Sequence, residues 1–150
     1  MNKFTDFLLV EDDENDVQLM RHAFAQGGFA HRLHAVHDGK EAMAYLAGEE
    51  PYSDRKKYPL PGVILLDLKM PRVNGFEFLE WLNTESPGDL RLLPVIVMSS
   101  SKHEKDVRKA YELGANCYLV KPVSWGEFLE RMKTINVFWG DHVEMPPVKV

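Results

Sequence analysis

The chain has 150 residues, 45% of them hydrophobic, and a formal net charge of -5 at pH 7. This length supports one domain with a substantial core and is too short for two comfortable ones. The negative charge argues against a general affinity for nucleic acid or anionic membranes. The single cysteine, Cys117, excludes an intramolecular disulfide, a structural zinc cluster and a CxxC redox site.

The sequence shows no targeting or membrane-spanning segment. Residues 1–6 lack the apolar run of a signal peptide, and no stretch approaches the roughly 18 consecutive apolar residues of a membrane span. We therefore expect a single domain over residues 1–150, with a core at about 5–138 and a C-terminal arm at 139–150. The expected location is the cytoplasm, where a cysteine stays reduced.

Short apolar runs alternate five times with segments of helical periodicity. Strands are predicted, in chain order, at 7–10, 32–37, 62–66, 94–98 and 117–120. A helix is predicted after each strand, the first ended by two glycines and the others at about 40–47, 75–85, 104–113 and 124–138. This alternation predicts an α/β fold, in which a doubly wound parallel sheet carries helices on both faces.

Two segments depart from the regular alternation. Residues 48–61 contain three prolines, mixed charge and no periodicity, so they are predicted to form a surface loop. For this loop a tolerated insertion is favoured over a role in partner contact. The last helix runs into Val137, Phe138 and Trp139, which can complete the core, although we favour a dimer or partner contact that extends through the tail to Val150.

Several side chains are assigned to the core or the surface from their spacing. Tyr111 falls on the inward face of the fourth predicted helix. His31, His34 and His37 lie on or beside a predicted strand, where they would alternate between faces, and their spacing does not match a metal site. We therefore expect the three histidines at the surface.

Charged and polar groups stand at the carboxyl ends of four predicted strands. Glu11 and Asp12 follow the first strand, Asp67 the third, Ser99 the fourth and Lys121 the fifth. In parallel sheets these ends share one edge, where ligands bind. Clustered carboxylates suit Mg²⁺, and a lysine suits a phosphoryl oxygen. The set is typical of phosphoryl transfer onto a carboxylate, with Asp67 as the nucleophile because it is the only acid on the central strand.

Four blocks of sequence resemble the motifs of bacterial response-regulator receiver domains. The blocks cover nearly the whole chain and consist of Val10 to Asp13, Leu66 to Pro71 with Gly75, Val97 to Ser100, and Gly114 to Pro122. The resemblance implies a five-stranded flavodoxin-like (βα)5 fold with strand order 2-1-3-4-5. Within the family, the chain is most similar to stand-alone phytochrome-associated regulators, which share the long loop, the run Tyr111 to Tyr118, and Phe138-Trp139 before a Pro-containing tail.

The resemblance also implies a role for each acidic group. Asp67 would accept the phosphoryl group from a sensor histidine kinase, here of the phytochrome type. Glu11, Asp12 and Asp67 would hold Mg²⁺ together with the backbone carbonyl of Lys69. The domain would catalyse its own phosphoryl acceptance and loss and would not be an enzyme acting on other substrates.

The remaining groups would convert phosphorylation into a change of surface. Ser99 would bond the phosphoryl group, Lys121 would pair with it, and Tyr118 would change rotamer with it. The peptide bond before Pro122 is cis in such domains. The output would be protein contact, with a homodimer formed through the face of the fourth and fifth helices and the C-terminal arm.

Other functions remain open at this point. The protein can be an unphosphorylated adaptor, or a phosphorelay intermediate for a kinase that is not a phytochrome. Haloacid-dehalogenase-type phosphohydrolases also phosphorylate an aspartate beside Mg²⁺, but they carry a second aspartate two residues later, where this chain has Lys69. Degenerate receivers typically lose an acid or the lysine, and here all are retained.

Overall fold

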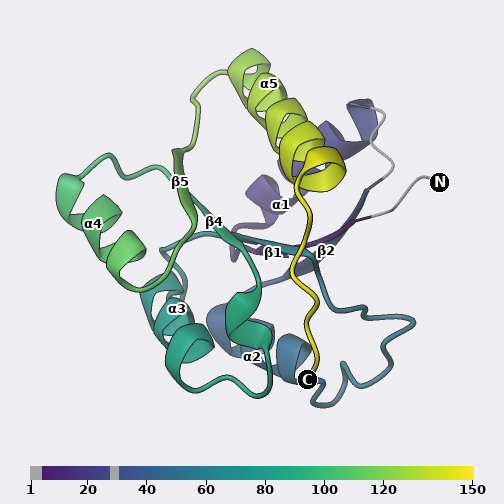
Figure 1. Ribbon diagram of the computed structural model, residues 1–150. Coiled ribbons are helices and arrows are strands. Elements are labelled where there is room, and N and C mark those ends of the chain that lie inside the picture. The colour runs from purple at the N-terminus through teal and green to yellow at the C-terminus, as the bar shows by residue number, and fades with distance from the viewer. Residues whose placement is uncertain (1–4, 28–30) are drawn as a thin grey trace.

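The chain folds around a five-stranded parallel sheet, as the computed structural model of residues 5–27 and 31–150 shows (Figure 1). The strand order is β2-β1-β3-β4-β5, so the predicted doubly wound fold and its strand order are confirmed. The strands are β1 (Asp6–Val10), β2 (Arg32–Val36), β3 (Val63–Leu66), β4 (Val95–Ser99) and β5 (Cys117–Val120).

Helices cover both faces of the sheet. Figure 1 shows α1 (Glu14–Gln26) and α5 (Trp125–Ile135) on one side. The other side carries α2 (Gly39–Ala47), α3 (Gly75–Thr84) and α4 (Glu104–Glu112). Two further turns are the 3-10 helix η1 (Leu90–Leu92) and the π-helix η2 (Asn136–His142).

Burial differs between the central and the edge strands. Every residue of β3 and β4 is buried, whereas each residue of β5 is only half-buried and β2 begins with an exposed residue. Central strands have helices over both faces, which explains why they are continuous apolar runs. Successive side chains of a strand point to opposite faces of the sheet. Leu8 of β1 packs on the side of α2 and α3, and Leu9 packs on the side of α1 and α5.

Side chains of the residues just before α1 and α3 cap the amino ends of these helices. The carboxyl of Asp13 accepts a hydrogen bond from the Asn15 amide at 2.8 Å at the start of α1. Asn74 and Glu77 form a reciprocal capping box at the start of α3. Such caps satisfy amides that have no partner within the helix, and they fix where the chain turns away from the sheet.

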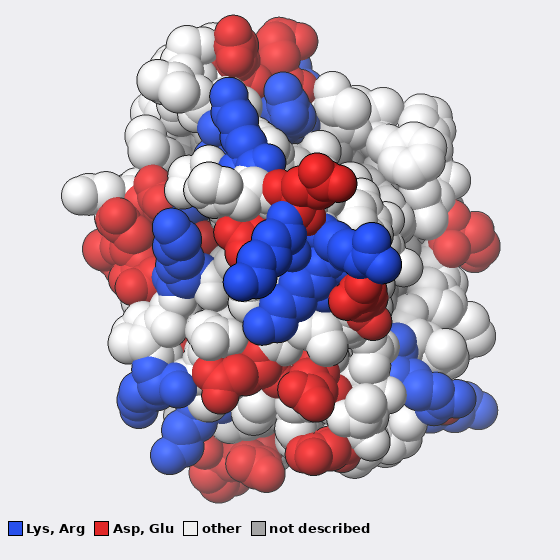
Figure 2. All heavy atoms as spheres, turned by 90° about the vertical axis from the view of Figure 1, so that its left-hand side faces the viewer, with Lys and Arg blue, Asp and Glu red and all other residues white. Residues whose placement is uncertain are grey.

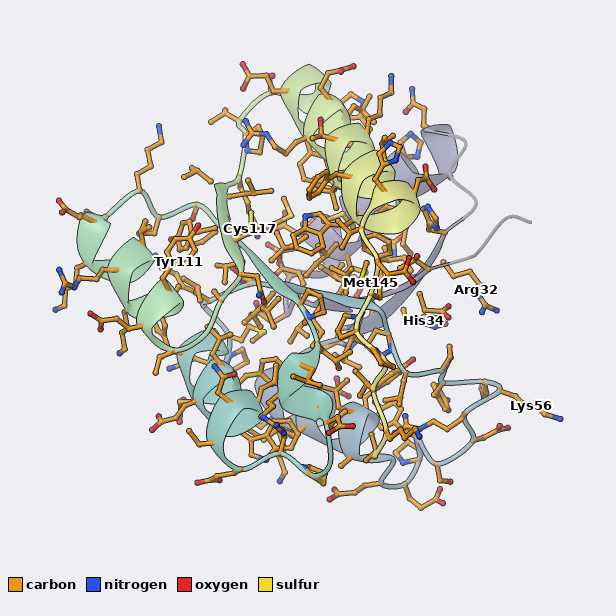
Figure 3. The ribbon with its side chains drawn as sticks, in the orientation of Figure 1. Arg32, His34, Lys56, Tyr111, Cys117 and Met145 are labelled. Carbon is orange, nitrogen blue, oxygen red and sulfur yellow. The ribbon has the colours of Figure 1, made fainter. Side chains whose placement is uncertain are left out.

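The loop over residues 48–61 folds back onto α2. The Arg55 guanidinium donates to the carbonyls of Tyr45 and Leu46, both at 2.8 Å, and so satisfies the carboxyl end of that helix. The rings of Tyr52 and Tyr58 pack against Tyr45, with centroids 5.3 and 5.9 Å away. Lys56 projects outward from the same loop (Figure 3).

The C-terminal part of the chain differs from its prediction. Helix α5 ends at Ile135 rather than near residue 138, and the chain widens into η2, where the side-chain amide of Asn136 donates to the Met132 carbonyl at 2.9 Å. The following segment then crosses from the α1–α5 side to the α2–α3 side (Figure 1). It passes the amino ends of the strands, where the Asp89 amide donates to the Lys149 carbonyl at 2.8 Å.

The prediction that His31 lies at the surface is wrong. Its ring is buried, with Nδ1 accepting from the Thr5 amide at 3.1 Å and Nε2 lying 2.7 Å from Asp141 Oδ1. A ring with a partner on each nitrogen can be buried at little cost. His34 is half-buried and contacts Asp6, and only His37 is exposed as predicted. Figure 3 shows His34 and Arg32 beside each other on β2.

Two smaller predictions also fail. Tyr111 is 49% exposed, because its hydroxyl lies outside the core and accepts from the Tyr118 amide at 3.1 Å. The peptide bond before Pro122 is trans, the form that X-Pro bonds generally prefer. Over the described ranges 5–27 and 31–150, no helix combines the length and apolar character that crossing a membrane requires.

Candidate functional site

The register of the sheet brings the predicted groups together. Val10 pairs with Leu66, so the next residues, Glu11 and Asp67, emerge side by side. In the same way Ser99 pairs with Val120, and Lys121 follows directly. Four strands therefore deliver acids, a hydroxyl and an ammonium to the carboxyl edge of the sheet.

Three carboxylates converge at this edge. Single oxygens of Glu11, Asp12 and Asp67 all lie within 4.8 Å of one another. Glu11 is buried, Asp67 is half-buried and Asp12 is exposed, so the cluster has a closed side and an open side. Hard cations accept oxygen donors of this kind and complete their shell with water or phosphate oxygens. The donor set therefore fits a divalent cation such as Mg²⁺.

The carboxyl groups are held in an environment that disfavours their charge. Burial raises the pKa of Asp67, and the nearby charge of Asp12 acts in the same direction, while Lys121 opposes both. Burial also raises the pKa of Glu11, against the hydrogen bond and charge of Lys121. A cation bound by the carboxylates would offset the repulsion between their negative charges and favour their ionised forms.

Lys121 is the shared counter-ion of the site. Its Nζ lies 2.7 Å from Glu11 Oε1, 3.1 Å from Asp16 Oδ2 and 3.8 Å from Asp67 Oδ1. Burial would lower the pKa of this ammonium, but the hydrogen bond with Glu11 and the charge of Asp67 outweigh burial and raise it. Asp16 was not among the site residues predicted from the sequence, although an acid in the first turn of a helix that starts at this edge is a usable signal.

The hydroxyl groups of Ser99 and Tyr118 both contact the backbone of Ser101. Ser99 is buried, and its Oγ accepts from the Ser101 amide at 3.1 Å. The Tyr118 hydroxyl donates to the Ser101 carbonyl at 2.9 Å. Ser99 and Tyr118 are thus linked through a single residue of the β4–α4 loop.

A cavity of about 310 Å³ opens beside the acids, between the sheet and the helices α1 and α5. Glu11, Asp67 and Lys121 line its polar end, and apolar side chains including Trp125 and Phe128 line the rest. Figure 2 shows the face onto which the carboxyl ends of the strands open, with Lys and Arg side chains gathered among acidic ones. The site therefore opens on a face of mixed charge, even though the chain is acidic overall.

Comparisons with known proteins agree with this geometry. Residues 7–133 match the model of the response regulator receiver domain. The response regulator Rcp1 of Synechocystis sp. is 36% identical over 139 residues, which make up 93% of this chain and 91% of that protein.

Two solved structures are similar over nearly the full length. The phosphorylated cyanobacterial phytochrome response regulator RcpA is 34% identical with a TM-score of 0.86, covering 97% of this chain and 100% of that one. The Mn²⁺-bound form of Rcp1 is 35% identical with a TM-score of 0.82, covering 95% and 99%. The chain belongs to the response regulator receiver domain family and is related to phytochrome response regulators.

Proposed function

We propose that the protein accepts a phosphoryl group on Asp67 from a histidine kinase, with Mg²⁺ held by Glu11, Asp12, Asp67 and the backbone carbonyl of Lys69. The observation that carries the proposal is the convergence of three carboxylates within 4.8 Å beside the Lys121 ammonium. The bound ion would neutralise charge on the phosphoryl oxygens.

The chain's own residues have distinct parts in this transfer. A carboxylate oxygen of Asp67 attacks phosphorus in line while the bond from phosphorus to the donor's imidazole nitrogen breaks, and the electron pair leaves with the imidazole. Lys121, which lies 3.8 Å from Asp67, takes up charge on a phosphoryl oxygen. The leaving imidazole then takes a proton from solvent.

Phosphorylation then changes the surface through Ser99 and Tyr118. A phosphoryl group adds roughly -1.5 to -2 charges near neutral pH. Ser99 turns its hydroxyl toward the new oxygens and withdraws it from the Ser101 amide, 3.1 Å away. The loop then shifts at Ser101, whose carbonyl holds the Tyr118 hydroxyl at 2.9 Å, and Tyr118 changes rotamer.

The proposed partners follow from the exposed surface and from the relatives. Phe138 is 53% exposed, and Val137 is exposed beside it, which supports a homodimer through the face of α4 and α5 and the C-terminal arm. Sedimentation that shows only a monomer at micromolar concentration, phosphorylated or not, would contradict the dimer. The proposal includes a single receiver domain over residues 1–150, a cytoplasmic location and no contact with nucleic acid or membrane.

The deciding experiment is the intact mass of the protein after incubation with Mg²⁺ and a small-molecule phosphodonor. One added phosphoryl group is expected, absent from Asp67→Asn and absent when a chelator removes the metal. A folded wild-type protein that binds Mg²⁺ and gains no mass, even when sampled within seconds, would favour the unphosphorylated adaptor.

The identity of the kinase needs a separate measurement. RcpA is a phytochrome response regulator, and we propose a bacteriophytochrome-type donor for this chain by that relationship. Phosphoryl transfer from a phytochrome kinase that is faster than from a light-insensitive histidine kinase supports the assignment. Equal or slower transfer would favour a phosphorelay intermediate for another kinase.

A further inference from the structure

The loop between β3 and α3, residues 68–74, is closed at its base. The Gly75 amide donates to the Leu68 carbonyl at 3.0 Å. A Cβ on Gly75 would lie 2.5 Å from the carbonyl oxygen of Asp67, so a residue with a side chain does not fit there. This loop begins at the phosphoacceptor and carries the Lys69 carbonyl.

A second attachment joins the loop to the turn between β2 and α2. The Gly39 amide donates to the Val73 carbonyl at 3.1 Å, and a Cβ on Gly39 would lie 2.6 Å from that oxygen. Beside this contact the Arg72 guanidinium donates to the carboxylate of Asp38. Strand β1 lies between β2 and β3, so both contacts reach across the strand that delivers the first two acids of the site.

Arg72 has an unusual backbone. Its φ is 63°, a positive value that Arg72 alone has among the non-glycine residues of 5–27 and 31–150. Residues with a Cβ rarely adopt this conformation, and it persists where the surroundings impose it. The Arg72 side chain is 60% exposed, whereas the Asp38 side chain is 4% exposed. Burial of its own side chain therefore does not hold Arg72, and the two contacts that restrain this part of the loop are the ion pair with the buried Asp38 carboxylate and the backbone hydrogen bond of the next residue, Val73, with Gly39.

We propose that Asp38 and Arg72 form a positioning pair for the metal site. By fixing Arg72, the pair sets the path of the loop so that the Lys69 carbonyl faces the carboxylates of Glu11 and Asp67. Both residues act through the loop and are not metal ligands. The proposal rests on the proposed function, because the Lys69 carbonyl is a ligand only if the site binds Mg²⁺.

The test is a double-mutant cycle read by calorimetric titration with Mg²⁺ alone. Arg72→Gly removes the guanidinium and suits a positive φ. Asp38→Asn removes the charge but keeps an oxygen for the Glu41 amide, which donates to Asp38 at 2.8 Å. Each single variant is expected to bind Mg²⁺ about 10-fold more weakly. The double variant should bind no more weakly than either single one, because both remove the same contact.

Additional measurements separate positioning from general damage. Hydrogen exchange of the Gly39 amide in metal-free protein should quicken in both single variants, since that amide holds Val73. Arg72→Lys keeps a cation and should show an intermediate affinity. Arg91→Gly changes an exposed arginine in η1 and should match wild type.

The Mg²⁺ affinities distinguish failure of the positioning pair from failure of the proposed function. Mg²⁺ affinities of Arg72→Gly and Asp38→Asn within about twofold of wild type, or losses that multiply in the double variant, would overturn the positioning pair while the proposed function stands. A wild-type protein that binds no Mg²⁺ would overturn both. If Asp38→Asn does not fold, Arg72→Gly and Arg72→Lys decide the question.

Discussion

The two ends of the parallel strands, which form the carboxyl edge and the amino edge of the sheet, are stabilised in opposite ways. At the carboxyl edge, acids such as Glu11 and Asp67 crowd together, and burial raises their pKa values. At the amino edge, polar groups are paired, with both ring nitrogens of His31 in contact with partners. The first arrangement favours an incoming cation or phosphoryl group, and the second holds distant parts of the chain together.

The proposed chemistry and the long-range contacts that stabilise the fold therefore depend on opposite ends of the same strands. Removing the carboxylate charge of Asp67 at the carboxyl edge should abolish the proposed phosphoryl acceptance at little cost to folding. Removing a partner at the amino edge should cost stability and leave the chemistry unchanged.

The largest expected effect is that of Asp67→Asn. Phosphoryl acceptance should fall to zero, because the nucleophilic oxygen is replaced by an amide. The free energy of unfolding should not decrease, since the carboxylate is disfavoured by burial. Intact mass and urea denaturation measure the two quantities. A loss of more than about 1 kcal/mol in the free energy of unfolding would contradict the claim that the acids of the carboxyl edge do not stabilise the fold.

Substitution of His31 by alanine should have the reverse effect. The variant should lose about 1–3 kcal/mol of unfolding free energy, because the Thr5 amide loses its acceptor and a buried ring is removed. Phosphoryl acceptance should stay at the wild-type level. His37→Ala removes an exposed ring and serves as the matched control, with a change below about 0.5 kcal/mol.

Lys69→Asn should change the lifetime of the phosphorylated state. Lys69 is exposed two residues after Asp67, where a cation could hold a phosphoryl group on Asp67 or obstruct attacking water. A change of several-fold corresponds to about 1 kcal/mol in the barrier. Decay is followed by intact mass after removal of the phosphodonor. Equal decay rates in the two proteins would disprove this role.

The smallest effect concerns pH and Asp38. Burial would raise the pKa of this carboxyl, but hydrogen bonds from the Glu41 amide and the Arg72 guanidinium outweigh burial and lower it from 3.8. The ionised Asp38 carboxylate therefore contributes to the stability of the fold above about pH 4, and this contribution is lost as the pH falls through its lowered pKa in the folded state. The stability difference between wild type and Asp38→Asn should shrink over that range, by less than about 1 kcal/mol. Urea denaturation at pH 6 and pH 3 tests this.

Much of the carboxyl edge could be predicted because its signals are local. An apolar run that ends in an acid identifies both a strand and the place of its last side chain, as Leu66 and Asp67 illustrate. The strand register then turns separate runs into one cluster. Asp16 escaped because it lies in the first turn of α1 and not directly after a strand, so the strand-end signal does not include it.

The contacts at the amino edge could not be predicted, because they join segments that lie far apart in the sequence. His31 is buried because of Asp141, which is 110 residues away, and no periodicity encodes such a pair. The strand begins only at Arg32, so the expected alternation of faces did not apply to His31. The packing of Met145 against the core and the hydrogen bond between the Asp89 amide and the Lys149 carbonyl likewise depend on tertiary packing alone.

The cavity beside the acids has an optical consequence. Trp125 lines the same space as Asp67 and Lys121, and its indole ring stacks on Phe128 with centroids 5.7 Å apart. Emission from an indole depends on nearby charge, so a cation or phosphoryl group that binds at Asp67 should alter the fluorescence of Trp125. Replacing Trp81 and Trp139 by phenylalanine leaves Trp125 as the one tryptophan of the sequence, so selective excitation of tryptophan should report the state of the site without an added label.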